Sequence, residues 1–161
     1  MLAALALAGC GPGPGERTAA SDKSVWDHFS VKLDGHAASL QLAVLPDEQQ
    51  RGLMQRPDLG RDEGMIFVDA RPHRLSFWMR NTPEPLDVAF LSPEGEVAEI
   101  YPLLPLDERA VSSHGDQLQM AIEMPSGWFA SHGIHPGSRV DMAAVKAALK
   151  DRGFDPARFK F

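Results

Sequence analysis

The chain has 161 residues, with a formal charge of −6 at neutral pH, a calculated isoelectric point near 5.4 and a single cysteine. An acidic chain without a stripe of lysine and arginine does not favour binding to nucleic acid. One cysteine cannot form an internal disulfide, so apolar burial must stabilise the fold.

The chain begins with a short apolar run that ends in Leu7-Ala8-Gly9-Cys10. This pattern is typical of a bacterial lipoprotein signal, in which the cysteine thiol receives a diacylglycerol. Residues 1–9 are shorter than a complete signal and carry no positive charge, so an apolar tail with a buried cysteine is the alternative. We expect residues 1–10 to be a signal remnant with a lipidated Cys10, which tethers the protein to a membrane. The expected location is the cell envelope facing the periplasm, and a glycine rather than an aspartate after Cys10 favours the outer membrane.

Residues 11–24 are small, polar and without periodicity, and we expect a flexible tether there. Residues 25–161 have the length of one globular domain with a single substantial core.

The domain begins with residues 29–33 and 38–44, where apolar and polar residues alternate as in β-strands. Between them, Asp34-Gly35 suits a two-residue hairpin turn with positive φ. Residues 46–54 predict a short helix, with a proline and two acidic residues at its positive N-terminal end.

The rest of the domain reads as short strands separated by turns, followed by a helix. Ser92-Pro-Glu-Gly95 has the composition of a type I turn, and 127–132 predicts one helical turn. The amphipathic residues 142–150 predict a C-terminal helix that stops at Gly153. The further strands are expected at 65–68, 75–79, 88–91, 97–101, 117–124 and 138–141. This pattern predicts a mostly β fold, a β-sandwich or distorted barrel with a short helix after the second strand and a C-terminal helix.

Several motifs in the middle of the chain resemble a known family. They are Arg51-Gly-Leu-Met54, Gly64-Met-Ile-Phe67, Phe77-Trp-Met-Arg-Asn-Thr82 followed by Pro85-Leu-Asp87, and Glu123-Met-Pro-Ser-Gly-Trp128. The chain resembles, over about residues 38–140, the bacterial and archaeal family of small exported proteins called domain of unknown function one-nine-two. The resemblance implies a compact, β-rich, sandwich-like domain and implies no reaction, because the family has no agreed activity.

The same motifs supply fork-shaped donors and short polar side chains beside a tryptophan. One interpretation is a pocket in which a guanidinium holds a carboxylate, a phosphate or a sugar hydroxyl against the Trp78 ring. The alternative is structural: Asp87 pairs with Arg51 or Arg80 and fixes how the helix docks on the sheet. The candidate ligand-binding residues are Arg51, Arg56, Trp78, Arg80, Asn81, Thr82 and Asp87.

We expect no metal or cofactor. The methionines have the contexts of core residues rather than of copper ligands, and proline and glycine interrupt the His132–His135 spacing. The function we favour is a non-catalytic, lipid-anchored envelope module that binds a small molecule, a glycan or an envelope protein. The alternative is a hydrolase acting on glycans or esters, in which Asp87 works with Glu123 or Asp62 as an acid and base.

Overall fold

The computed structural model describes residues 16–161. The expected signal remnant and the lipidation site Cys10 lie outside the described residues. Within residues 16–161, no helix combines the length and the hydropathy needed to cross a bilayer.

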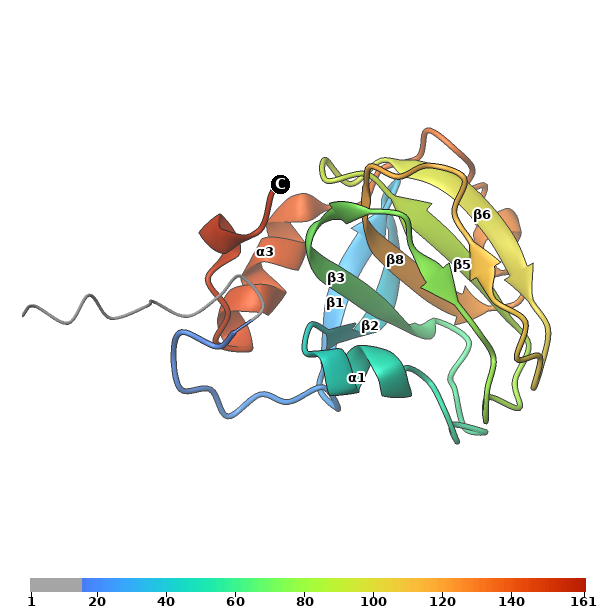
Figure 1. The fold of residues 1–161 in the computed structure, drawn as a ribbon. Helices are drawn as coiled ribbons and strands as arrows, with labels where there is room; N and C mark the ends of the chain where they lie inside the picture. Colours follow the sequence, from blue (N-terminus) through green and yellow to red (C-terminus); the bar gives the residue numbers. More distant parts are fainter. Residues whose placement is uncertain (1–15) are drawn as a thin grey trace, which may run out of the picture.

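The domain is built around one six-stranded mixed sheet in the order β1-β2-β3-β8-β5-β6 (Figure 1). Every neighbouring pair is antiparallel except β2 and β3, which are parallel. The central strand β8 joins two halves of the sheet, because it pairs with β3 on one side and with β5 on the other. The six strands are β1 (His28–Leu33), β2 (His36–Ala43), β3 (Glu63–His73), β5 (Leu86–Leu91), β6 (Val97–Leu103) and β8 (Leu118–Pro125).

A second, two-stranded sheet pairs β4 (Ser76–Phe77) with β7 (Val111–Ser112). β4 leads into the polar loop that carries the predicted site. The strand expected at 75–79 is therefore shorter than predicted, since the backbone N–H of Met79 donates to the carbonyl of Asp107 in a loop instead of to a ladder.

The predicted turns are present. Asp34 and Gly35 have φ values of 45° and 88°, as the tight hairpin between β1 and β2 requires. The N–H of Gly95 donates to the Ser92 carbonyl at 3.0 Å and closes the turn between β5 and β6. The last expected strand, 138–141, is reduced to isolated bridges from Arg139 and Val140.

Four helical segments accompany the sheet: α1 (Pro46–Arg51), α2 (Trp128–Ser131), α3 (Met142–Asp151) and the 3-10 turn η1 (Pro156–Arg158). Asp141 caps α3, because its carboxylate accepts from the N–H groups of Ala143 and Ala144. Both predicted principal helices are thus confirmed, and α1 is shorter than the expected 46–54 because Gly52 ends it.

The sheet buries a separate apolar cluster on each face. One cluster includes Leu40, Ile66 and Ile122 and is covered by α2 and α3. The other includes Phe67, Val88 and Phe90 and is covered by the segment after α1 and by the region around β4. The mostly β prediction is confirmed, and the sheet is open rather than a closed barrel.

A buried ion pair ties the first helix to the last. Arg152, at the end of α3, is fully buried and donates to the Glu48 carboxylate of α1 at 2.6 Å and to the Leu42 carbonyl of β2. Burial alone would raise the pKa of Glu48, but the hydrogen bonds from Arg152 and from the backbone N–H groups of Leu45 and Val44 lower it below its ordinary value.

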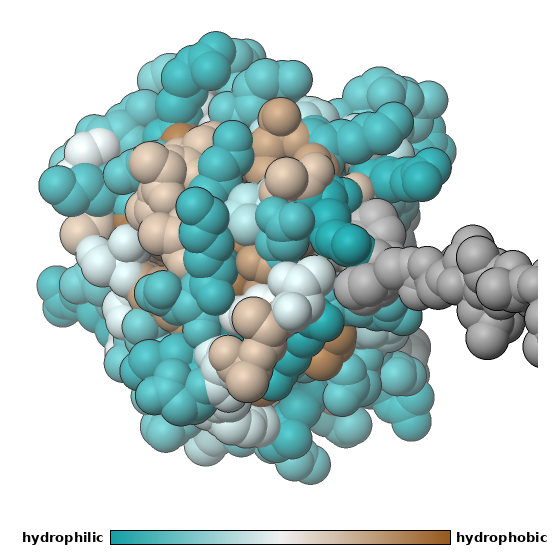
Figure 2. All heavy atoms as spheres, turned by 90° about the vertical axis from the view of Figure 1, so that its left-hand side faces the viewer, coloured by the Kyte–Doolittle hydropathy of each residue, from teal (hydrophilic) through white to brown (hydrophobic). Residues whose placement is uncertain are grey.

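Residues 16–24, the second part of the expected tether, lie against the end of α3. The N–H groups of Thr18 and Ala19 donate to the Gly153 carbonyl at 2.7 and 3.2 Å, and the Ser21 hydroxyl donates to the Asp151 carbonyl. Figure 2 faces this end of the molecule, where small groups of apolar residues are interrupted by hydrophilic ones.

Candidate functional site

A pocket with a volume of about 150 Å³ lies where the end of α1 meets β3 and the segment around β4. We call it the Glu123 pocket. Gly52, with φ 49° and ψ −133°, adopts a conformation that favours glycine and turns the chain sharply after α1. The turn places Leu53 in the apolar cluster beneath the pocket. The lining residues are Gln49, Gln50, Arg51, Gly52, Leu53, Met54, Phe67, Ser76, Phe77, Trp78, Thr82 and Glu123.

Glu123 is the acidic residue of this pocket. It lies on the central strand β8, in register with Met65 of β3 and Val88 of β5, so that its neighbours across the sheet are apolar. Only 4% of its surface is exposed. Burial raises the pKa of the Glu123 carboxyl to about 8, because an apolar surrounding disfavours the charged form. At neutral pH the group is therefore mostly protonated and can donate as well as accept a hydrogen bond.

No hydrogen bond or ion pair joins the Glu123 side chain to another residue in the range 16–161. The fully enclosed side-chain polar atoms without a partner in this range are Gln119 Oε1 and Arg152 Nε, so the Glu123 oxygens are not fully enclosed. Both facts are consistent with a carboxyl group that reaches the pocket rather than the closed core.

Aromatic rings form much of the wall. The Phe67 and Phe77 rings meet edge to face with centroids 4.8 Å apart, and Phe77 in turn lies 5.8 Å from Phe90. Trp78, which is 39% exposed, stands at the rim. These contacts fix the ring of Phe77 between β3 and β5.

A second hollow of about 260 Å³ adjoins the first and shares Gln50, Arg51, Met54 and Trp78 with it. Its other lining residues are Asp47, Arg80 and Asn81. The sequence-based expectation that the end of the helix and the loop after Trp78 meet at one surface agrees with this geometry.

Backbone contacts hold the two segments together. Asn81 has a positive φ of 55°, and its carbonyl accepts from the N–H of Gln55 at 2.8 Å. Thr82 is buried, and its hydroxyl donates to the Arg80 carbonyl at 3.3 Å. Thr82 therefore shapes the loop as well as lining the Glu123 pocket.

The arginines at the rim lie over tryptophan rings. The Arg51 guanidinium carbon is 4.4 Å from the centroid of Trp26, and that of Arg80 is 5.5 Å from the centroid of Trp78. Neither arginine forms an ion pair with Asp87 in the described part of the chain, because Asp87 is directed elsewhere.

Two of the predicted residues, Arg56 and Asp87, line neither of these two hollows. Arg56 donates to the Gln41 side chain at 3.1 Å and to Asp58 at 2.9 Å, and so ties the loop after α1 to β2. Asp87 accepts from the N–H of Gly127 at 2.7 Å.

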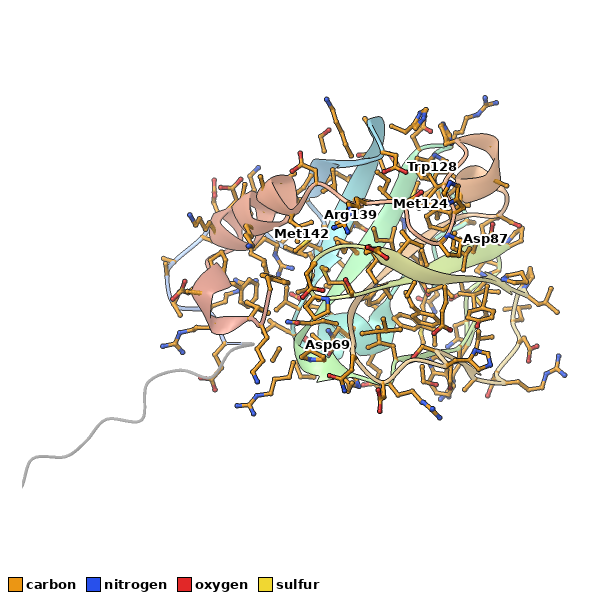
Figure 3. All side chains as sticks on the ribbon, turned by 90° about the horizontal axis from the view of Figure 1, so that it is seen from above. Asp69, Asp87, Met124, Trp128, Arg139 and Met142 are labelled. Carbon is orange, nitrogen blue, oxygen red and sulfur yellow. The ribbon has the colours of Figure 1, made fainter. Side chains whose placement is uncertain are left out.

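Asp87 lies on the opposite face of the sheet from Glu123. Within β5, Leu86 and Val88 belong to the apolar cluster beneath the pocket, so the intervening Asp87 points the other way. Figure 3 shows Asp87 on the side of Trp128 and Met124, far from Asp69, whose carboxylate accepts from the pocket residue Gln49. The pairing of Asp87 with Arg51 or Arg80 that the structural interpretation expected is therefore not formed, and the buried pair that docks α1 is Glu48 with Arg152.

Comparison with known proteins identifies the family. The family model of DUF192, described as "Uncharacterized ACR", matches residues 29–142. This chain belongs to the DUF192 family. The match confirms the resemblance found from the sequence motifs.

Two solved structures resemble the DUF192 domain closely. One, from Sinorhizobium meliloti 1021, is provisionally described as a transcription regulator; it has 28% sequence identity and a TM-score of 0.69, and the match covers 74% of this chain and 96% of that one. The other is a protein of unknown function from Novosphingobium aromaticivorans, with 37% identity and a TM-score of 0.66 over 71% of this chain and 84% of that one. No curated protein matches the sequence.

The DUF192 domain shows no group of three or more His, Cys, Asp or Glu side chains that could hold a metal ion within residues 16–161. Glu123 is not among the candidate ligand-binding residues of the sequence analysis, which names it only as a partner of Asp87 in the hydrolase alternative. The sequence does contain an indication of this site. Glu123 is the single charged residue in the apolar run Met120-Ala-Ile-Glu-Met124, and a strand buried on both faces normally carries apolar side chains.

Proposed function

We propose that this protein is a lipid-anchored domain of the bacterial cell envelope that binds a small ligand in the Glu123 pocket and catalyses no reaction. The anchor rests on the sequence motif that ends in Cys10. The ligand site rests on one observation: a buried carboxyl group that has no partner among residues 16–161, in a hollow whose rim carries Arg51 and Trp78.

The cost of burying this group favours a role in binding. A buried polar group without a hydrogen-bond partner costs roughly 1–3 kcal/mol, whereas an apolar side chain at position 123 would contribute to packing. A strongly perturbed acid in a cleft is a typical feature of a functional site. A bound ligand would supply the missing partner of Glu123.

The arrangement favours binding over hydrolysis. Glycoside hydrolysis uses two carboxyl groups that flank one bond, and the face position of Asp87 separates it from Glu123. The Glu123 pocket has one acidic lining residue, Glu123, and one basic lining residue, Arg51, and therefore does not supply a second carboxyl group.

Nucleic acid is a poor candidate for the ligand. The chain carries a formal charge of −6, and a carboxyl group at the base of a small pocket does not attract phosphate. The description of the Sinorhizobium structure as a transcription regulator is therefore not carried over to this chain.

The binding proposal is tested by finding the ligand. The full chain is purified from bacterial membranes in mild detergent and examined by native mass spectrometry, together with the variants Glu123→Gln and Asp87→Asn. We expect a bound small molecule in the wild type and in Asp87→Asn, which leaves the pocket unchanged, and its loss in Glu123→Gln. A wild type without bound molecules, and without a shift in melting temperature against a panel of envelope sugars, amines and carboxylates, would overturn the proposal.

The anchor is tested separately by metabolic labelling with palmitate. We expect the label in the wild type and its absence in Cys10→Ser, with the protein moving from the membrane to the soluble fraction. An unlabelled wild type, or a label that persists in the variant, would exclude lipidation at Cys10.

A further inference from the structure

We infer that the ligand of the Glu123 pocket carries a small organic ammonium group, primary or quaternary, which lies against Glu123 among the aromatic side chains. This inference rests on the proposed binding function and names the chemical class of its ligand. It follows from the charge, the walls and the size of the pocket.

Within residues 16–161, no positively charged side chain pairs with Glu123 in the pocket. Its other polar lining residues, Gln49, Gln50, Ser76 and Thr82, are neutral. Arg51 is the lining base, and its guanidinium lies over the ring of Trp26 and forms no ion pair with Glu123 within the described range. A ligand cation would therefore provide the opposite charge that no residue of the described range places against Glu123.

The aromatic walls of the pocket favour an organic cation, whose charged nitrogen carries methyl or methylene groups. Phe67, Phe77 and Trp78 contribute three aromatic side chains to the lining. Aromatic rings attract organic ammonium groups through their negative faces. An alkylammonium ion also gains from the burial of its methyl or methylene groups, which a hydrated metal ion does not.

The size restricts the group that enters. A cavity of about 150 Å³ holds a molecule the size of benzene. A trimethylammonium group or a short alkylammonium chain fits this volume. The adjoining hollow of about 260 Å³, with Arg80 and Asn81, can take the oxygen-bearing end of the same ligand.

Binding of a cation is coupled to loss of a proton from Glu123. Because the pKa of the free pocket's carboxyl is about 8, a cation that needs the carboxylate must displace a proton below that pH. The facing residues in register on β3 and β5, Met65 and Val88, carry no titratable group, and Arg51 is the other charged residue of the lining. Affinity should therefore rise about tenfold for each pH unit between about pH 6 and pH 8 and level off above.

The experiment uses choline chloride and n-butylammonium chloride as probes, each with its uncharged isostere of the same shape. Binding to the full chain is measured by calorimetry at about pH 6, 7 and 8 and constant ionic strength, in two buffers that differ in ionisation enthalpy so that the protons released are counted. We expect at least one cation to bind tenfold or more tightly than its isostere at pH 8, with nearly one proton released at pH 6. Glu123→Gln should remove this preference, and Asp87→Asn should keep it.

Two results would overturn the inference. If the isosteres bind as well as the cations and affinity does not change with pH, Glu123 binds a neutral ligand, and the proposed binding function stands without the ammonium group. If neither cation binds at any pH, the ligand class is wrong, and the search for a bound molecule by mass spectrometry decides the binding function independently.

Discussion

The buried carboxyl group of Glu123 gives a stability prediction that needs no knowledge of the ligand. In the unfolded chain the group ionises with an ordinary pKa near 4.5, whereas in the folded protein its pKa is about 8. Between these two pH values the folded state holds a proton that the unfolded state has lost. The free energy of unfolding therefore falls as pH rises through this window.

The magnitude follows from the two pKa values. Each tenfold change in a proton equilibrium corresponds to about 1.4 kcal/mol. Relative to its value below pH 4.5, the free energy of unfolding of the wild type should be lower by about 2 kcal/mol at pH 6 and by about 4 kcal/mol at pH 8, because of the raised pKa of Glu123. In Glu123→Gln the amide stays neutral, so any cost of burying it is the same at every pH.

Urea unfolding of the wild type and Glu123→Gln from about pH 5 to pH 8 measures this difference. We expect the free energy of unfolding of Glu123→Gln, relative to that of the wild type, to increase steadily as pH rises. Glu48→Gln is the matched control, because the pKa of Glu48 is lowered and its contribution is present above pH 4.5 and lost as pH falls. A difference between wild type and Glu123→Gln that does not change with pH would show that water or a charge reaches the carboxylate, and would refute this account of the site.

Three further substitutions test other contacts. Arg152→Met should lower the free energy of unfolding by about 3–5 kcal/mol at neutral pH, because it leaves Glu48 buried and charged, and by less below pH 4.5; an unchanged urea midpoint would contradict this. Gly64→Ala should destabilise the β3–β8 pairing by about 1–3 kcal/mol, since its new Cβ would clash with the Glu123 carbonyl oxygen, whereas Gly115→Ala meets its neighbours only at 3.4 Å and should change little in the same assay. Arg80→Ala should shift the melting temperature only slightly, because this exposed side chain contacts mainly the Trp78 ring; a large loss would assign Arg80 to the scaffold.

The sequence predicted the local elements of this fold well where turn chemistry and periodicity agreed. The hairpin at Asp34-Gly35 and the helix after Asp141 follow from short-range rules that tertiary contacts do not override. The parallel pairing of β2 with β3 and the placement of β8 between β3 and β5 depend on long-range contacts that leave no local pattern. Strand 75–79 was overestimated because loop contacts, rather than a ladder, satisfy its later backbone groups.

The candidate site could be predicted in part. Arg51, Trp78 and Thr82 come together because the motifs that carry them end neighbouring elements. Strand alternation predicts that Asp87 points to the opposite face of the sheet from Leu86 and Val88. Which face bears the pocket depends on where α1 and β4 pack, and the sequence of β5 does not contain that information. The Glu48–Arg152 pair joins positions more than a hundred residues apart, so no spacing rule could find it.

The late position of β8 in the chain has a consequence for biosynthesis. Residues 28–73 and 86–103 form the two halves of the sheet, and each half keeps an unpaired edge until residues 118–125 have been made. A nascent chain that ends at residue 117 should therefore be digested readily by protease, whereas the finished chain resists it.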